Sequence, residues 1–147
     1  MTAVGGELVE RKPRKILLVD DSEVIRETVA MMLEEQGYTV ICLDSVFSFS
    51  PTLQRERPDL ALVDVGMPAL RGDQLVGLAR HRPYVCPLVL FSDRPAEELR
   101  VLGTACGAAG FIRKTSDGEA LARDIEGIIR NATPPPGSST PPRSGTG

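Results

Sequence analysis

The chain has 147 residues, of which 41% are apolar and 25% are charged, and its formal net charge at pH 7 is −3. Length and composition are those of one globular domain, and the small negative charge favours neither nucleic acid nor an anionic membrane as a partner. Every apolar run is shorter than the roughly 18 residues of a membrane span, and residues 1–15 lack the apolar core of a signal peptide.

Cysteine usage points to a reducing compartment. Cys42, Cys86 and Cys106 lie far apart in apolar surroundings, and none belongs to a CxxC pair. With only one histidine in the chain, neither a zinc site nor a disulfide framework is expected. We therefore expect buried thiols in a cytoplasmic protein.

Three regions differ in composition: a leader at 1–13, a patterned body at 14–131 and a tail at 132–147. The tail contains five prolines and no large apolar residue. It cannot bury enough surface to offset the entropy of ordering it, so we expect it to be disordered, like the polar leader. A proline-rich ligand for a partner protein is the alternative reading of the tail.

Within the body, short apolar runs alternate with amphipathic segments. The predicted strands are 15–20, 38–43, 60–65, 87–92 and 110–114. The predicted helices are 22–36, 51–57, 70–80 and 95–104, with a last helix that begins near Ser116. Near-continuous apolar strands separated by helices predict an α/β fold, a doubly wound parallel sheet with helices on both faces.

Capping signals define several helix ends. Gly37 ends the first helix, and Ser50 with Pro51 opens the second. Ser116 and Glu119 form a capping box for the last helix. Apolar residues recur at helical spacing in the first and last helices: Ile25, Val29, Met32 and Leu33, then Leu121, Ile125 and Ile128.

Polar residues collect at the carboxyl ends of the predicted strands, where α/β proteins place their functional groups. These residues are Asp20, Asp21, Asp64, Ser92 and Lys114. Three neighbouring carboxylates repel one another and suit Mg²⁺, and a lysine and a hydroxyl beside that ion would receive a phosphoryl group. Taken singly, the acids and the serine could be helix caps and the lysine a surface residue. Their joint occurrence at successive strand ends favours one shared site.

Four segments carry a specific resemblance. "ILLVDDS", "LALVDVGMP", "LVLFS" and "GFIRK" resemble, in order and spacing, the signature segments of the receiver domain of two-component response regulators. The similarity covers about residues 14–131. It implies the flavodoxin-like (βα)5 arrangement with strand order 2-1-3-4-5.

The resemblance also implies roles for individual residues. Asp64 would be the phospho-acceptor, and Asp20, Asp21, Asp64 and the backbone carbonyl of Gly66 would bind Mg²⁺. Ser92 and Lys114 would hold the phosphoryl group, and Ser92 with Phe111 would form the conformational switch. Phe111 is equally an ordinary core aromatic by its sequence context.

A switch of this kind implies protein partners. The donor would be a sensor histidine kinase or a phosphotransfer protein, and the target would bind the face formed by the fourth helix, the fifth strand and the fifth helix. The chain would catalyse nothing beyond its own phosphorylation and dephosphorylation. No room remains for an effector domain after residue 131, so we expect a single-domain regulator that signals through another protein.

Two positions depart from the family pattern. Asp93 follows Ser92 where receivers have a small residue, and its charge would disfavour an incoming phosphoryl group unless Arg94 compensates. Gly66, Asp93 and Arg94 are therefore expected to modulate the reaction. Thr115 follows Lys114 where the family has proline, which makes a cis peptide bond unfavourable there. Thr115 could instead help to cap the last helix.

The segment before the second helix contains Phe47 and Phe49 on alternate positions. A core location is favoured for both, and an exposed partner patch is the alternative.

Two other functions compete with the phosphorylated switch. One is a degenerate receiver that binds partners without phosphorylation, which Asp93 and Thr115 motivate. The other is a phosphohydrolase of the haloacid-dehalogenase type. Such enzymes have a DxD element after the first strand, whereas Asp20 and Asp21 are adjacent, so this reading ranks last.

Overall fold

A computed structural model describes residues 13–66 and 86–132. The predicted helix at 70–80 and nearly all of the leader and of the proline-rich tail lie outside these ranges. Among the helices inside them, none is long and apolar enough to cross a membrane.

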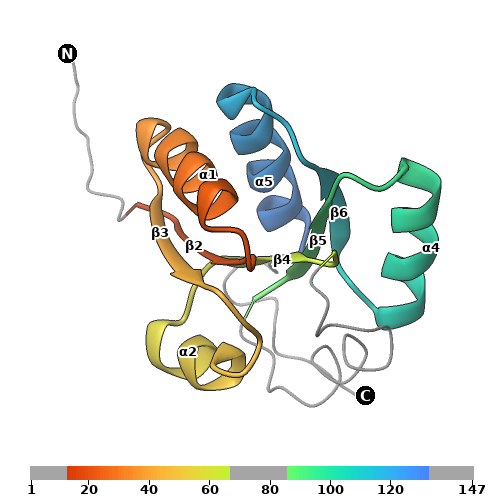
Figure 1. Cartoon of the computed structure of the whole chain (residues 1–147), viewed down its shortest axis with the longest axis horizontal. Coiled ribbons are helices and arrows are strands. Elements are labelled where there is room, and N and C mark those ends of the chain that lie inside the picture. The colour runs from red at the N-terminus through yellow and green to blue at the C-terminus, as the bar shows by residue number, and fades with distance from the viewer. Residues whose placement is uncertain (1–12, 67–85, 133–147) are drawn as a thin grey trace, which may run out of the picture.

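Five parallel strands form one sheet in the described part of the chain (Figure 1). The strands are β2 Lys15–Val19, β3 Thr39–Leu43, β4 Leu60–Asp64, β5 Leu88–Ser92 and β6 Gly110–Arg113. Their spatial order is β3-β2-β4-β5-β6, which is 2-1-3-4-5 when they are counted along the chain. The predicted flavodoxin-like order is confirmed, and each strand lies within its predicted range.

The strand register brings the carboxyl ends together at one edge of the sheet. Val19 of β2 pairs with Leu43 on one side and Val63 on the other. Asp64 of β4 pairs with Phe91, and Ser92 of β5 pairs with Arg113. The polar residues that end or follow these strands are therefore neighbours although they are distant in sequence.

Two apolar cores cover the two faces of the sheet, because alternate strand residues point to opposite faces. Helices α1 Glu23–Glu35 and α5 Gly118–Ala132 pack on one face, against Ile16, Leu18, Leu62, Val89 and Phe91. Helices α2 Phe49–Glu56 and α4 Ala96–Cys106 pack on the other, against Leu17, Val19, Val63, Leu88 and Leu90. Figure 1 shows α1 beside α5 and α2 across the sheet from them.

The ends of α1 follow the predicted signals. The Ser22 hydroxyl accepts a hydrogen bond from the Ile25 amide at 3.3 Å, and Gly37, just beyond the helix, has a left-handed φ of +94°. Val29 and Leu33 are buried, as the helical spacing predicts.

The starts of α2 and α5 differ from the predictions. Helix α2 begins at Phe49, two residues early, with Ser48 rather than Ser50 as its N-cap. Pro51 fits inside the first turn because amides there lack helical partners. Helix α5 begins at Gly118. The predicted capping box of Ser116 and Glu119 is not formed, because Asp117 precedes the helix as its cap.

Asp117, and not the predicted Ser116, is the N-cap of α5. The Asp117 carboxylate accepts from the Ala120 amide at 3.1 Å, and the Thr115 hydroxyl accepts from the Asp117 amide at 3.0 Å. Thr115 thus helps to shape the entry to α5, and the peptide bond before it is trans.

Two exposure predictions are wrong. Phe49 is fully buried at the start of α2, but Phe47 is 86% exposed on the preceding turn. Cys42 is exposed because it lies on β3, the strand at the sheet edge, whereas Cys86 and Cys106 are buried as expected.

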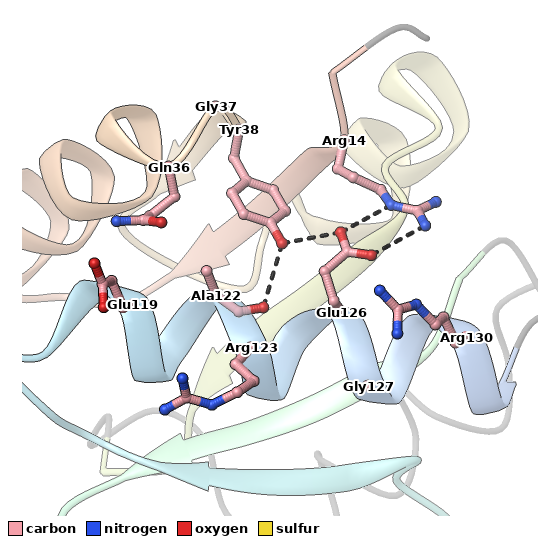
Figure 2. Close-up of a pocket in the computed structure, with 10 residues that line it drawn as sticks. All are labelled: Arg14, Gln36, Gly37, Tyr38, Glu119, Ala122, Arg123, Glu126, Gly127 and Arg130. Atoms are coloured by element: carbon pink, nitrogen blue, oxygen red, sulfur yellow. Dashed lines mark hydrogen bonds and ion pairs between the residues drawn. The ribbon is translucent and has the colours of Figure 1, made fainter.

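A polar network, here called the amino-end brace, links Arg14, Tyr38 and Glu126 at the end of the sheet where β2 and β3 begin (Figure 2). Arg14 donates to both carboxylate oxygens of Glu126, at 3.0 and 3.2 Å. The Tyr38 hydroxyl donates to Glu126 Oε2 at 2.9 Å. The brace fastens α5 to the starts of two strands and lies beside an open hollow of about 600 Å³.

Candidate metal centre

Two acids follow β2 at the carboxyl end of the strands, which is opposite the amino-end brace. The Asp20 amide donates to the Leu43 carbonyl at 3.0 Å, which extends the β2–β3 pairing by one residue. The Ser22 amide donates to Asp20 Oδ1 at 2.9 Å at the start of α1. Asp20 is fully buried, and Asp21 is exposed.

Asp64 is the last residue of β4 and is only 6% exposed. Its Oδ1 accepts a hydrogen bond from the Gly66 amide at 2.9 Å. A Cβ atom at position 66 would lie 3.3 Å from that same oxygen, so a larger residue would crowd the carboxylate. The Gly66 amide thus holds the Asp64 carboxylate at the turn that follows β4.

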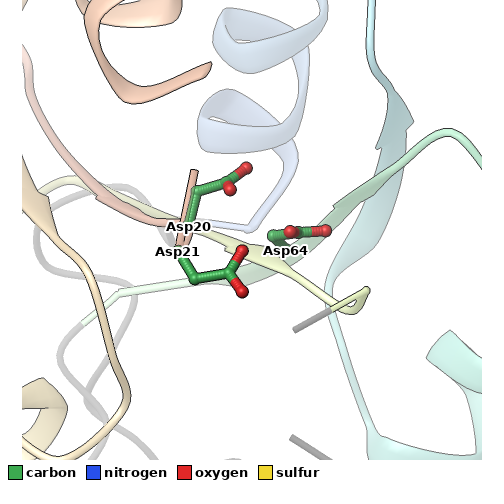
Figure 3. Close-up of side chains that lie close together, drawn as sticks. All are labelled: Asp20, Asp21 and Asp64. Carbon is green, nitrogen blue, oxygen red and sulfur yellow. The ribbon is translucent and has the colours of Figure 1, made fainter. Parts of the chain in front are cut away.

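Asp20, Asp21 and Asp64 form a cluster, here called the acidic rim (Figure 3). One carboxylate oxygen from each lies within 4.8 Å of the others. The predicted meeting of these three acids is therefore observed, and they come from the ends of two adjacent strands.

Lys114 supplies positive charge to the acidic rim. Its ammonium lies 3.1 Å from Asp20 Oδ2 and 3.6 Å from Asp64 Oδ1. It also lies over the Phe91 ring, 5.6 Å from the ring centre. Lys114 thus occupies its predicted place although threonine, not proline, follows it.

The electrostatics of the rim are unbalanced. Three carboxylates face this one ammonium group, and Asp20 Oδ2, although close to Lys114, accepts no well-aligned hydrogen bond from residues 13–66 or 86–132. Burial raises the pKa of Asp64 most strongly, and the nearby Asp20 and Asp21 raise it further. The Gly66 amide and Lys114 oppose that rise.

These features fit a divalent cation. Mg²⁺ prefers carboxylate oxygens and retains several waters. The rim offers three carboxylates, and one buried oxygen among them accepts no hydrogen bond from the described residues. The receiver resemblance adds the Gly66 carbonyl as a ligand, which stays a prediction.

Ser92 ends β5 at the same edge and is buried. Its hydroxyl accepts from the Arg94 amide at 3.1 Å, and its carbonyl accepts from the Lys114 amide at 3.0 Å. The side chains of Asp93 and Arg94 are exposed. Arg113 donates to the Asp93 carbonyl at 3.3 Å, so β6 also holds this turn.

Phe111 lies on β6 in register with Leu90 and is partly buried against the core on the α2 and α4 face. Its position is two residues before Arg113, the partner of Ser92. Phe111 is thus two residues from the Ser92 end of the strand pair, and it is not part of the acidic rim.

Two contacts of the site were not anticipated from the sequence. Phe91 lies beneath Lys114, and Arg26 of α1 donates to the Asp20 carbonyl at 2.8 Å. The available signal for Arg26 was a basic residue one turn into a helix, where a positive charge is normally unfavourable.

Comparison with known proteins identifies the family of this domain. A family model described as the response regulator receiver domain matches residues 16–126. The chain is 34% identical over 115 residues to the transcriptional regulatory protein CseB of Streptomyces coelicolor, with 78% of this chain and 49% of CseB covered. It is 32% identical over 123 residues to the phosphate regulon transcriptional regulatory protein PhoB of Klebsiella pneumoniae, with 82% and 54% covered.

Solved structures give the same assignment. The chemotaxis response regulator CheY4 of Vibrio cholerae matches with a TM-score of 0.68 at 28% identity, covering 79% of this chain and 98% of that one. Full-length FixJ of B. japonicum matches with a TM-score of 0.73 at 25% identity, covering 84% and 61%.

The chain spans about half the length of the curated relatives CseB and PhoB. The shared part is the sheet with the acidic rim, which the family model covers from β2 to within α5. The chain therefore belongs to the receiver domains of two-component response regulators.

Proposed function

We propose that Asp64 accepts a phosphoryl group, in the presence of Mg²⁺, from a histidine kinase or a phosphotransfer protein in the cytoplasm. The observation that carries this proposal is the nearly buried Asp64 carboxylate at a strand end, close to two further acids and to Lys114. A purely structural acid would not be placed among like charges, because such contacts are unfavourable.

The reaction is a phosphoryl transfer between two side chains. An Asp64 carboxylate oxygen forms a bond to phosphorus while the phosphorus–nitrogen bond of the donor phosphohistidine breaks. The imidazole leaves with the electron pair and takes up a proton. When bound at the acidic rim, Mg²⁺ would offset negative charge on the carboxylates and on the transferring group.

Lys114 and Ser92 would hold the product. The Lys114 ammonium is 3.6 Å from Asp64 Oδ1, so it can pair with a phosphoryl oxygen after a small movement. The Ser92 oxygen accepts the Arg94 amide, and this leaves the hydroxyl hydrogen available for donation to the phosphoryl group.

The output would be a change in the surface formed by α4, β6 and α5. Movement of Ser92 toward the phosphoryl group would displace the turn at 93–95 and leave space for Phe111 to rotate inward. A partner protein that prefers this arrangement would then bind the phosphorylated form more tightly. Asp93 and Arg94, exposed on the same turn, and Gly66 beside Asp64 would modulate the rate and lifetime of the modification.

Intact-mass measurement tests the proposal. We expect incubation with acetyl phosphate and Mg²⁺ to add the mass of one phosphoryl group to the wild type. Asp64→Asn should gain nothing, whereas Glu126→Gln, at the opposite end of the sheet, should be labelled normally. Equal labelling of Asp64→Asn and the wild type would refute Asp64 as the acceptor. No labelling of a folded wild type would favour the phosphorylation-independent binding module.

A further inference from the structure

Arg26 joins helix α1 to the backbone of the acidic rim. It is the fourth residue of α1, and its amide makes the first helical hydrogen bond, to the Ser22 carbonyl at 2.9 Å. Its side chain is half-buried, and its guanidinium Nη1 donates to the Asp20 carbonyl at 2.8 Å.

This position is an unfavourable one for a cation. The amino end of a helix carries a partial positive charge, so arginine is disfavoured in the first turns. The side chain can nevertheless reach back past the helix start, because Cα–Cβ bonds in a helix lean toward the amino end. A residue that breaks a local preference while making a specific contact at a site indicates a use that offsets the cost.

The bond acts on the peptide group that joins the two metal-binding candidates. That group is planar, so fixing the Asp20 carbonyl oxygen also fixes the direction in which the chain continues to Asp21. Asp20 itself is already held by the Leu43 carbonyl and the Ser22 amide. The carboxylate of Asp21, by contrast, accepts no hydrogen bond from any residue in 13–66 or 86–132, so its place depends on the backbone.

We propose that Arg26 is a positioning residue that sets the Asp20–Asp21 peptide so that both carboxylates meet Asp64 around the cation. This role rests on the proposed function insofar as Mg²⁺ is the ion bound. The contact of Arg26 at the rim is with the Asp20 carbonyl and not with a carboxylate, so Arg26 acts through the backbone.

If Arg26 acted only through its charge, replacing it would change the Mg²⁺ affinity in the opposite direction. A guanidinium close to the acidic rim repels a divalent cation, so removing its charge without any change in geometry would tighten Mg²⁺ binding. Loss of the positioning bond instead weakens binding. The direction of the change in affinity therefore separates the two roles.

Mg²⁺ titration of the full chain, followed by amide chemical shifts, measures this. We expect Arg26→Met to weaken Mg²⁺ binding about fivefold, the scale of one lost hydrogen bond. Arg26→Lys, whose ammonium can donate to the same carbonyl, should stay within about twofold of the wild type. Arg123→Met, which removes an exposed arginine beside the amino-end hollow, is the matched control and should leave the affinity unchanged.

A second readout separates positioning from damage to the fold. Labelling of Arg26→Met by acetyl phosphate should be slow at low Mg²⁺ and should recover when Mg²⁺ saturates the site. Thermal unfolding checks that the variant is folded. If Arg26→Met does not fold, Arg26→Gln, which is uncharged and too short to reach the carbonyl, replaces it.

Unchanged or tighter Mg²⁺ binding by folded Arg26→Met, or equally weak binding by Arg26→Lys, would overturn the positioning role. Failure of the proposed function gives a different result. In that case the wild type itself binds no Mg²⁺, or Asp64→Asn binds it as tightly as the wild type does.

Discussion

The polar clusters at the two ends of the sheet differ in their balance of charge. In the amino-end brace, one guanidinium meets one carboxylate through two hydrogen bonds, and the Tyr38 hydroxyl adds a third. In the acidic rim, three carboxylates share one ammonium group, and a buried Asp20 oxygen lacks a hydrogen bond within the described ranges. The brace is complete as it stands and serves stability, whereas the rim has acceptor capacity left for a cation.

Removing the acid of the brace should give the largest stability effect. Glu126→Leu leaves the Arg14 guanidinium and the Tyr38 hydroxyl without their carboxylate. We expect a loss of about 2 kcal/mol in the free energy of unfolding, between the values for exposed and buried ion pairs. Urea unfolding measures it, and Asp124→Leu, at an exposed acid of the same helix, is the control. A loss no larger than that of the control would mean that the brace does not hold α5.

Removing an acid of the rim should instead increase the free energy of unfolding. In Mg²⁺-free buffer at pH 7, Asp64→Asn is expected to be about 1 kcal/mol more stable than the wild type, because burial of the charged carboxylate, and after it repulsion by Asp20 and Asp21, disfavour ionised Asp64. Urea unfolding of both proteins tests this. A destabilised Asp64→Asn would mean that the rim is a balanced structural network.

The two regions should also differ in pH dependence. The hydrogen bonds from Arg14 lower the pKa of Glu126 in the folded state. The contribution of Glu126 to stability is therefore present above the pKa of the unfolded state and is lost as pH falls through the pKa of the folded state. The pKa of Asp64 is raised, so the native state binds that proton more tightly and stability falls as pH rises through this range. The stability advantage of Asp64→Asn over the wild type should therefore shrink on acidification, and so should the stability deficit of Glu126→Leu. The measurement is the free energy of unfolding of each variant and of the wild type from pH 3 to pH 7, about the range where carboxylates titrate. If the curves of the variants ran parallel to that of the wild type, both pKa shifts would be contradicted.

The smallest expected effect concerns Asp93. Its exposed carboxylate lies on the turn after Ser92, so its repulsion of a phosphoryl group is weakened by solvent. We expect Asp93→Ala to be labelled by acetyl phosphate about two to three times faster at low salt, with little difference at high salt. Time-resolved intact mass gives both rates, and equal or slower labelling of the variant at low salt would show that this acid does not impede the reaction.

The sequence predicted the sheet and the rim because their signals are local and repeated. Each strand is a short apolar run, and the acids and Lys114 stand directly at strand ends, so topology alone brings them together. The starts of α2 and α5 were less predictable, since Ser48, Ser50, Ser116 and Asp117 are all competent caps and the choice depends on tertiary packing. The contact from Arg26 to the Asp20 carbonyl and the brace between Arg14 and Glu126 depend on three-dimensional reach, which residue patterns do not encode.

The dependence of stability on Mg²⁺ tests most directly whether the acidic rim is an incomplete site that a cation completes. At a Mg²⁺ concentration about ten times the dissociation constant, the free energy of unfolding of the wild type should rise by about 1.4 kcal/mol. Glu126→Leu should gain the same amount, because the brace is remote from the ion, and Asp64→Asn should gain clearly less. No rise in the wild type, or an equal rise in Asp64→Asn, would contradict the account.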